Sequence, residues 1–117
     1  MHNMNNNETI EAEQGKTYES GEVTVGKDIK CTIRGTCCAW VKNLGFATVQ
    51  KGGHAKVLNG GIATVEKGGH AWVQSGGRAD VCDGGYAYVH NGGCVLADNG
   101  AIIDAQPGSI INGAVTE

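Results

Sequence analysis

The sequence predicts a single-domain, all-β solenoid (a β-helix) in which each coil contains about sixteen residues. Between residues 45 and 108 the chain repeats itself every sixteen residues, and each repeat consists of two similar octads with the consensus G-x-A-x-V-x-x-G. A fixed period this short is typical of a stack in which each repeat packs only against its neighbours. Glycine makes up 20 of the 117 residues and recurs at fixed octad positions, which indicates regular turns rather than disorder.

The octads extend over most of the chain, so one domain is expected from its length of 117 residues. The frame is weak over residues 13–20 and imperfect over 109–116, but it can be followed through both segments. Residues 1–12 are polar, rich in asparagine and without periodicity. We therefore predict a flexible polar tail or loose cap at 1–12 and a solenoid domain at 13–117.

Each octad is predicted to form one short strand followed by one tight turn. Positions 3 and 5 are apolar and positions 2, 4 and 6 vary, which is the alternation of a strand with one buried face. Positions 7, 8 and 1 read NGG, KGG, SGG or DGG, and glycine and asparagine favour turns because they tolerate positive φ. The predicted buried pairs are Ala39/Val41, Ala47/Val49, Ala55/Val57, Ala63/Val65, Ala71/Val73, Ala79/Val81 and Ala87/Val89. Cys31 is also predicted to point inward.

Three arrangements of these strands are compatible with the octad. The strands could wind into a two-sided coil of sixteen residues, a triangular coil of three octads, or an antiparallel meander of hairpins. The strongest similarity lies between octads n and n+2, where His54 matches His70; Trp40 matches Trp72 at twice that separation. This favours the two-sided coil, because that arrangement places similar residues on top of one another.

The paired glycines also carry a family resemblance. The pattern G-G-x-A-x-V, as in Gly60–Val65 and Gly68–Val73, resembles the repeats of autotransporter-adhesin passengers over about residues 37–108. Such passengers are β-solenoids that bind through their surface. The resemblance therefore implies a solenoid fold and a binding role.

Most aromatic side chains are predicted to lie on one sheet. If two octads form one coil, both tryptophans, two of the three tyrosines and three of the four histidines point outward from alternate octads, the first of which begins at residue 37. Aromatic residues on a rigid sheet are typical of binding surfaces, since Tyr and Trp bury a large area at small entropic cost. The predicted partner-binding residues are Trp40, His54, Lys56, His70, Trp72, Tyr86, Tyr88 and His90.

A purely structural interpretation of these aromatic residues remains open, because stacked aromatic side chains also stabilise an exposed sheet. If the face is an interface, it could bind a foreign protein or a second copy of the chain. Open solenoid ends expose unpaired backbone groups, and we therefore also expect a homo-oligomer.

The sequence gives little support for catalysis, and we expect no enzyme activity and no cofactor. Phosphate-loop, nucleophile-elbow and HExxH motifs are absent. Short turns build no cleft. His54, His70 and Cys38 are possible metal ligands, but their spacing provides no tetrahedral set, so no metal is predicted. The net charge of −3 argues against nucleic-acid binding.

The N-terminal sequence and the cysteines bear on location. Residues 1–13 lack the basic and apolar regions of a signal peptide. No apolar run approaches the roughly 18 residues of a membrane span. Five cysteines, an odd number, suit a reducing compartment. We expect a cytoplasmic protein without membrane association, in the host cytoplasm if a phage encodes it.

Together these observations predict a non-enzymatic, protein-binding β-solenoid of bacterial or phage type. The aromatic sheet face would recognise the partner, and binding could inhibit a host complex such as a defence system. Two alternatives are an adhesin-like or phage-tail structural module and a carbohydrate-binding β-helix, which the Trp and Tyr side chains would permit.

Overall fold

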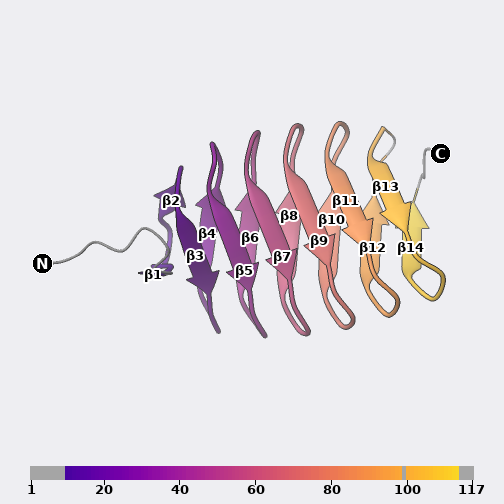
Figure 1. Ribbon diagram of the computed structural model, residues 1–117, viewed down its shortest axis with the longest axis horizontal. Coiled ribbons are helices and arrows are strands. Elements are labelled where there is room, and N and C mark those ends of the chain that lie inside the picture. Colours follow the sequence, from indigo (N-terminus) through magenta and orange to yellow (C-terminus); the bar gives the residue numbers. More distant parts are fainter. Residues whose placement is uncertain (1–9, 99, 114–117) are drawn as a thin grey trace, which may run out of the picture.

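The chain forms an all-β solenoid, described here from a computed structural model that covers residues 10–98 and 100–113. Two parallel seven-stranded sheets lie face to face, and the chain alternates between them (Figure 1). The first sheet contains β1 (Ile10–Glu11), β3 (Glu22–Val25), β5 (Cys38–Val41), β7 (His54–Val57), β9 (His70–Val73), β11 (Tyr86–Val89) and β13 (Ile102–Ala105). The second contains β14 (Ile110–Gly113), β12 (Cys94–Ala97), β10 (Arg78–Val81), β8 (Ile62–Val65), β6 (Phe46–Val49), β4 (Lys30–Ile33) and β2 (Thr17–Tyr18).

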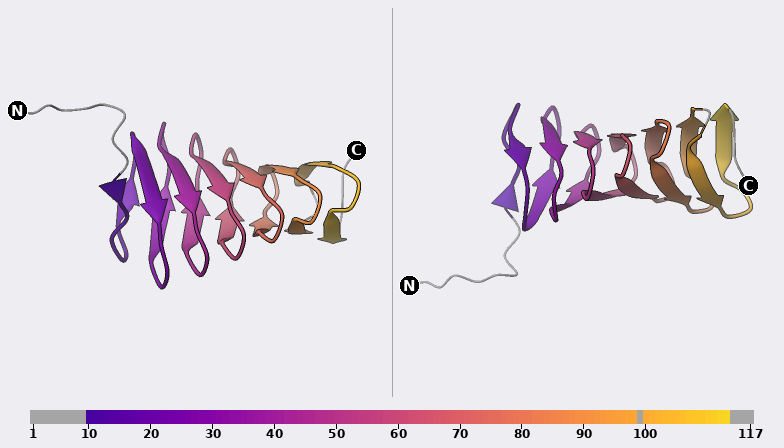
Figure 2. Two further views of the ribbon diagram at one scale, coloured as in Figure 1. Left: turned by 60° about the horizontal axis from the view of Figure 1, so that its bottom comes forward. Right: turned by 90° about the horizontal axis from the view of Figure 1, so that it is seen from above.

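The register confirms the two-sided coil of about sixteen residues. His54 pairs with His70, and Ala55 with Ala71, in adjacent parallel strands. The other strand pairs between β3 and β14 share this offset, and Figure 2 shows the coils following one another along the axis. The hairpin meander and the triangular coil are therefore excluded.

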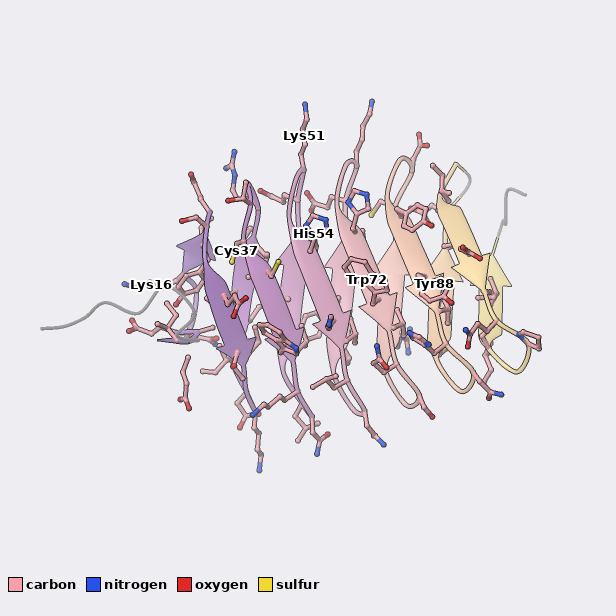
Figure 3. All side chains as sticks on the ribbon, viewed as in Figure 1. Lys16, Cys37, Lys51, His54, Trp72 and Tyr88 are labelled. Atoms are coloured by element: carbon pink, nitrogen blue, oxygen red, sulfur yellow. The ribbon has the colours of Figure 1, made fainter. Side chains whose placement is uncertain are left out.

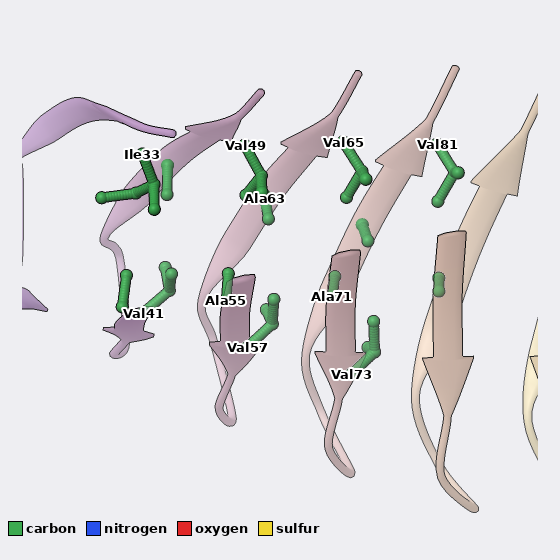
Figure 4. Packing of buried hydrophobic residues seen from close by; sticks show 14 of the residues in the cluster. Ile33, Val41, Val49, Ala55, Val57, Ala63, Val65, Ala71, Val73 and Val81 are labelled. Carbon is green, nitrogen blue, oxygen red and sulfur yellow. The ribbon is translucent and has the colours of Figure 1, made fainter. Parts of the chain in front are cut away.

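The core is a thin apolar layer between the two sheets. Val57, Val65 and Val73 have no exposed surface, and Ala63 is equally buried (Figure 4). All seven predicted Ala/Val pairs are at most 1% exposed, and Cys31 is 3% exposed, which confirms their inward orientation. Full burial of a valine side chain contributes about 1.5–3 kcal/mol, and the described core contains no buried polar or charged residue.

The turns have a common geometry that extends the hydrogen bonding of the strands. The Gly53 N–H donates to the Gln50 carbonyl at 2.8 Å, and Gly52 between them has φ 85°. A positive φ at the third residue of a β-turn is characteristic of type II. The Gly52 N–H also donates to the Gly68 carbonyl of the next coil at 3.1 Å. The turns are therefore tied to one another along the solenoid.

Octad position 1 is a third buried position rather than part of an exposed turn. Gly53 and Gly69 are buried, and Cys37 has no exposed surface. A Cβ atom on Gly69 would lie 2.6 Å from the carbonyl oxygen of Val49. Glycine is needed at residue 69 because the preceding coil leaves no room for a side chain at that point.

The first coils depart from the regular register. Ile10 pairs with Val23 and Thr17 pairs with Thr32, offsets of thirteen and fifteen residues instead of sixteen. The first sheet consequently begins at Ile10, three residues before the predicted domain boundary, and Ala12 is buried in the core. Residues 1–9 of the predicted tail or cap lie outside the described residues. The described ranges contain no helix, and so none that could cross a membrane.

Candidate functional site

The outward side chains of four central strands of the first sheet form one continuous surface. We call this surface the aromatic face and define it as the outward residues of β5, β7, β9 and β11 together with the residue that follows each strand. Strand alternation puts octad positions 2, 4 and 6 on this side. Its members are Cys38, Trp40, Lys42, His54, Lys56, Leu58, His70, Trp72, Gln74, Tyr86, Tyr88 and His90.

Position 2 carries a column of stacked rings. The imidazoles of His54 and His70 lie 4.9 Å apart between centroids and 13° from parallel. The Tyr86 ring follows at 5.4 Å from His70, tilted by 42°. Cys38 pairs with His54 at the other end of the column. The parallel register therefore holds three ring side chains in one row.

Position 4 carries the two tryptophans, separated by a lysine. Trp40 pairs with Lys56, and Lys56 pairs with Trp72. The Lys56 ammonium lies 5.9 Å from the Trp40 ring centroid, within cation–π range. Trp72 leans across the sheet and stacks on His54, with centroids 5.8 Å apart and planes 19° from parallel. This diagonal contact links the two columns.

The remaining aromatic side chains of the face are fixed by their neighbours. The Tyr88 and His90 rings meet edge-on, with centroids 4.9 Å apart and an angle of 76°. The Gln106 amide donates a hydrogen bond of 2.9 Å to the Tyr88 hydroxyl. Figure 3 shows His54, Trp72 and Tyr88 on the sheet that faces the viewer, whereas Lys51 extends from a turn. The structure thus brings all eight predicted site residues onto one face.

An open hollow of about 340 Å³ lies between the two tryptophans. It is lined by Glu22, Cys38, Ala39, Trp40, His54, Ala55, Lys56 and Trp72. Sequence reasoning did not assign Glu22 and Cys38 to the site. The available signal was their place in the position-2 column, where Glu22 lies two coils and Cys38 one coil before His54.

The fold changes the titration of His70. Burial, and to a smaller degree the neighbouring His54, lowers the pKa of His70 from its ordinary value of 6.5. Its Nδ1 atom is buried without a hydrogen-bond partner. Both observations favour the neutral imidazole, which stacks without charge repulsion.

The second sheet has a different outward surface. The Arg78 Nε lies 3.6 Å from the Asp80 carboxylate, and the Gln50 amide donates to Glu66 at 3.3 Å. Cys82 lies beside these acids; burial, followed by the charges of Asp98, Glu66 and Asp80, raises the pKa of its thiol. Within residues 10–98 and 100–113, no group of three or more His, Cys, Asp or Glu side chains could hold a metal ion.

Comparison with known proteins gives a distant structural similarity and no family match. No protein-family model matches the sequence, and no curated protein matches it significantly. One similar solved structure is the crystal structure of a TibA fragment hyper-glycosylated by TibC, with 23% identity over 93% of this chain and a TM-score of 0.43. The chain spans half the length of that fragment.

Proposed function

We propose that this protein is a non-enzymatic binding protein that recognises a protein partner through the aromatic face. The observation that supports this most directly is the ordered cluster of Trp40, His54 and Trp72 around the hollow. Rigid tryptophan side chains at a hollow are the usual anchors of protein interfaces, because little entropy is lost when they are covered.

The backbone below the face favours binding without rearrangement. Each central strand is hydrogen-bonded to a neighbour on both sides, and the turns are bonded between coils. A partner therefore meets side chains that are already positioned. Preorganisation of this kind increases affinity without additional contacts.

The proposal includes inhibition and self-association as consequences of the same rigid shape. A solenoid that covers a functional surface of a host complex, such as a defence system, would block that surface sterically. β13 and β14 form the outermost described rung at the C-terminal end of the two sheets, and sheet edges of this kind pair readily with further strands. The cytoplasm is the proposed location, since all five cysteines are free thiols.

Affinity capture with matched variants tests the proposal. The full chain, a Trp40→Ala/Trp72→Ala variant and a Phe46→Ala/Ile62→Ala variant of the second sheet are used to capture proteins from bacterial lysate. Circular dichroism and thermal melts check that each variant is folded. We expect the tryptophan variant to lose a partner that the second-sheet variant retains.

The other outcomes decide between alternatives. Equal capture by all three proteins would remove the aromatic face from the proposal. Tryptophan-dependent binding on a glycan array, without a protein partner, would replace it with carbohydrate recognition. Once a partner is identified, loss of its activity on addition of the full chain tests inhibition.

A further inference from the structure

The aromatic face carries basic side chains and no acidic ones. Lys42 and Lys56 are exposed on it, and His54, His70 and His90 lie beside the tryptophans and tyrosines. Neither aspartate nor glutamate occurs among its twelve described residues. This contrasts with the whole chain, which has 12 acidic and 9 basic residues. On the same sheet, Glu22 and Asp104 flank the aromatic face on the neighbouring strands β3 and β13.

The second sheet shows that the absence of acidic side chains is specific to the aromatic face. Over the corresponding strands β6, β8, β10 and β12 and the residues that follow them, one basic side chain, Arg78, stands beside Glu66, Asp80 and Asp98. Both surfaces are built from the same octad, so the repeat does not dictate the difference. The position-2, 4 and 6 residues of the two faces have distinct chemistry.

In the hollow, a positive charge lies beside an apolar surface. Trp40 and Trp72 form its apolar walls, and the Lys56 ammonium lies over the Trp40 ring. Lys42 follows the same strand as Trp40, and Glu22 lies at the far, N-terminal wall. An apolar side chain could fill the hollow while an adjacent carboxylate reached Lys56 or Lys42. The carboxylate would avoid the Glu22 end because of like-charge repulsion.

We propose that the aromatic face binds an acidic polypeptide segment, in which aspartate or glutamate residues flank an apolar or aromatic anchor. This inference rests on the proposed function and adds the chemistry of the partner. The anchor occupies the hollow between Trp40 and Trp72, and the carboxylates pair with Lys56 and Lys42. Opposite charges around an apolar centre provide specificity and speed association.

A polypeptide fits these charges better than a nucleic acid does. The net charge of −3 repels a polyanion at long range. The face has two lysines and no arginine, whereas strands of nucleic acid are usually held by a groove lined with many basic residues. A short segment with a few carboxylates requires only local positive charge.

The test uses a phage-displayed library of random 12-residue peptides and the immobilised full chain. Peptides that also bind Trp40→Ala/Trp72→Ala are removed by counter-selection. The remaining peptides are synthesised, and their affinities are measured by fluorescence anisotropy. We expect enrichment of Asp and Glu next to Trp, Phe or Leu. We also expect binding to weaken as NaCl rises from 50 to 500 mM.

Two charge reversals provide a matched pair. Lys56→Glu should weaken binding of the selected peptides about tenfold, because it replaces attraction by repulsion at the hollow. Lys51→Glu makes the same change at a turn, where the side chain extends away from the sheet (Figure 3), and should change binding less than about twofold. Equal effects of the two substitutions would overturn the inference.

The outcomes separate this inference from the proposed function. Tryptophan-dependent peptides that are neutral or basic would overturn the acidic partner and leave protein binding by the face intact. If no tryptophan-dependent peptide is recovered, both fail. The binding of a labelled twelve-nucleotide oligo-dT is measured in parallel. If it binds more tightly than the peptides and its binding depends on the tryptophans, the proposed partner would be a nucleic acid instead of a polypeptide.

Discussion

The imidazole of His54 stacks on that of His70, with ring centroids 4.9 Å apart and planes 13° from parallel. Sixteen residues separate them in the chain, and one rung of a parallel sheet separates them in space. The contact shows how the repeat determines the surface, since residues one coil apart become neighbours. It also brings together two groups that cannot both be protonated without repulsion.

The stability of the fold should therefore decrease as the pH falls below about 6.5. The pKa of His70 is lowered in the folded state by burial and by His54. The unfolded chain then binds a proton more readily, so the free energy of unfolding falls as the pH falls. The contribution of His70 is complete above its ordinary pKa of 6.5 and is lost as the pH drops through the lowered value. Urea unfolding should give nearly equal midpoints at pH 7.5 and 6.5 and a lower midpoint at pH 5.5.

The variant His70→Gln is the control for this pH dependence. It removes the titrating group and keeps a polar side chain on the sheet. We expect the urea midpoint of the variant to change less between pH 7.5 and 5.5 than that of the parent. If the urea midpoint of the variant changes with pH as much as that of the parent, other groups produce the effect.

The sequence predicted the alternation and the coil period, and therefore the members of the face. Trp40 and Trp72 occupy the same column because the octad keeps its length between them. The burial of Ala63 and Val65 was predicted from their positions in the octad. A regular repeat transfers position in the sequence directly to position in space.

Features that depend on local packing could not be predicted in this way. The offset of Ile10 from Val23 depends on how the first coils close, where the octad is weak. The stacking of Trp72 on His54 depends on side-chain rotamers that the repeat does not fix. The hollow follows from that rotamer and was therefore not foreseen.

The five cysteines should differ widely in reactivity. Cys38 is exposed, whereas Cys31 and Cys37 are buried. Burial raises the pKa of Cys31 to about 11. Burial, with smaller contributions from Cys38 and Cys31, raises the pKa of Cys37 to about 11. Because the thiolate is the reactive form, a thiol reagent at pH 8 should label Cys38 first and the two buried thiols only on unfolding.

Peptide mapping by mass spectrometry identifies the labelled thiols. Cys38→Ser should remove the fast phase and lower the total number of thiols labelled after denaturation by one. Labelling of Cys37 at the rate of Cys38 would contradict the burial of octad position 1.

Gly69→Ala should destabilise the protein by about 1–3 kcal/mol, as expected when a close-packed site is overfilled. The new Cβ atom would lie 2.6 Å from the Val49 carbonyl oxygen, which is backbone and cannot move freely. Gly26→Ala is the matched control, because a Cβ atom there meets nothing within 4 Å and its φ is not positive. Its free energy of unfolding should change by less than about 0.5 kcal/mol. Denaturant titrations of both variants measure the difference, and equal losses would contradict the close approach of the coils.

The thin core makes each inward valine important for stability. Val65 has no exposed surface, and its neighbours Val49 and Val81 in the adjacent coils are at most 1% exposed. Val65→Ala removes two methyl groups and leaves a cavity that the hydrogen-bonded sheets cannot close, at a cost of about 2 kcal/mol. Lys67→Ala in the following turn is the control and should have an effect below about 0.5 kcal/mol. Urea unfolding of the two variants gives the comparison. If hydrogen exchange shows that Val65→Ala loses protection at one end of the solenoid only, the coils unfold separately. An unaltered urea midpoint of Val65→Ala would mean that the column through Val65 is not close-packed.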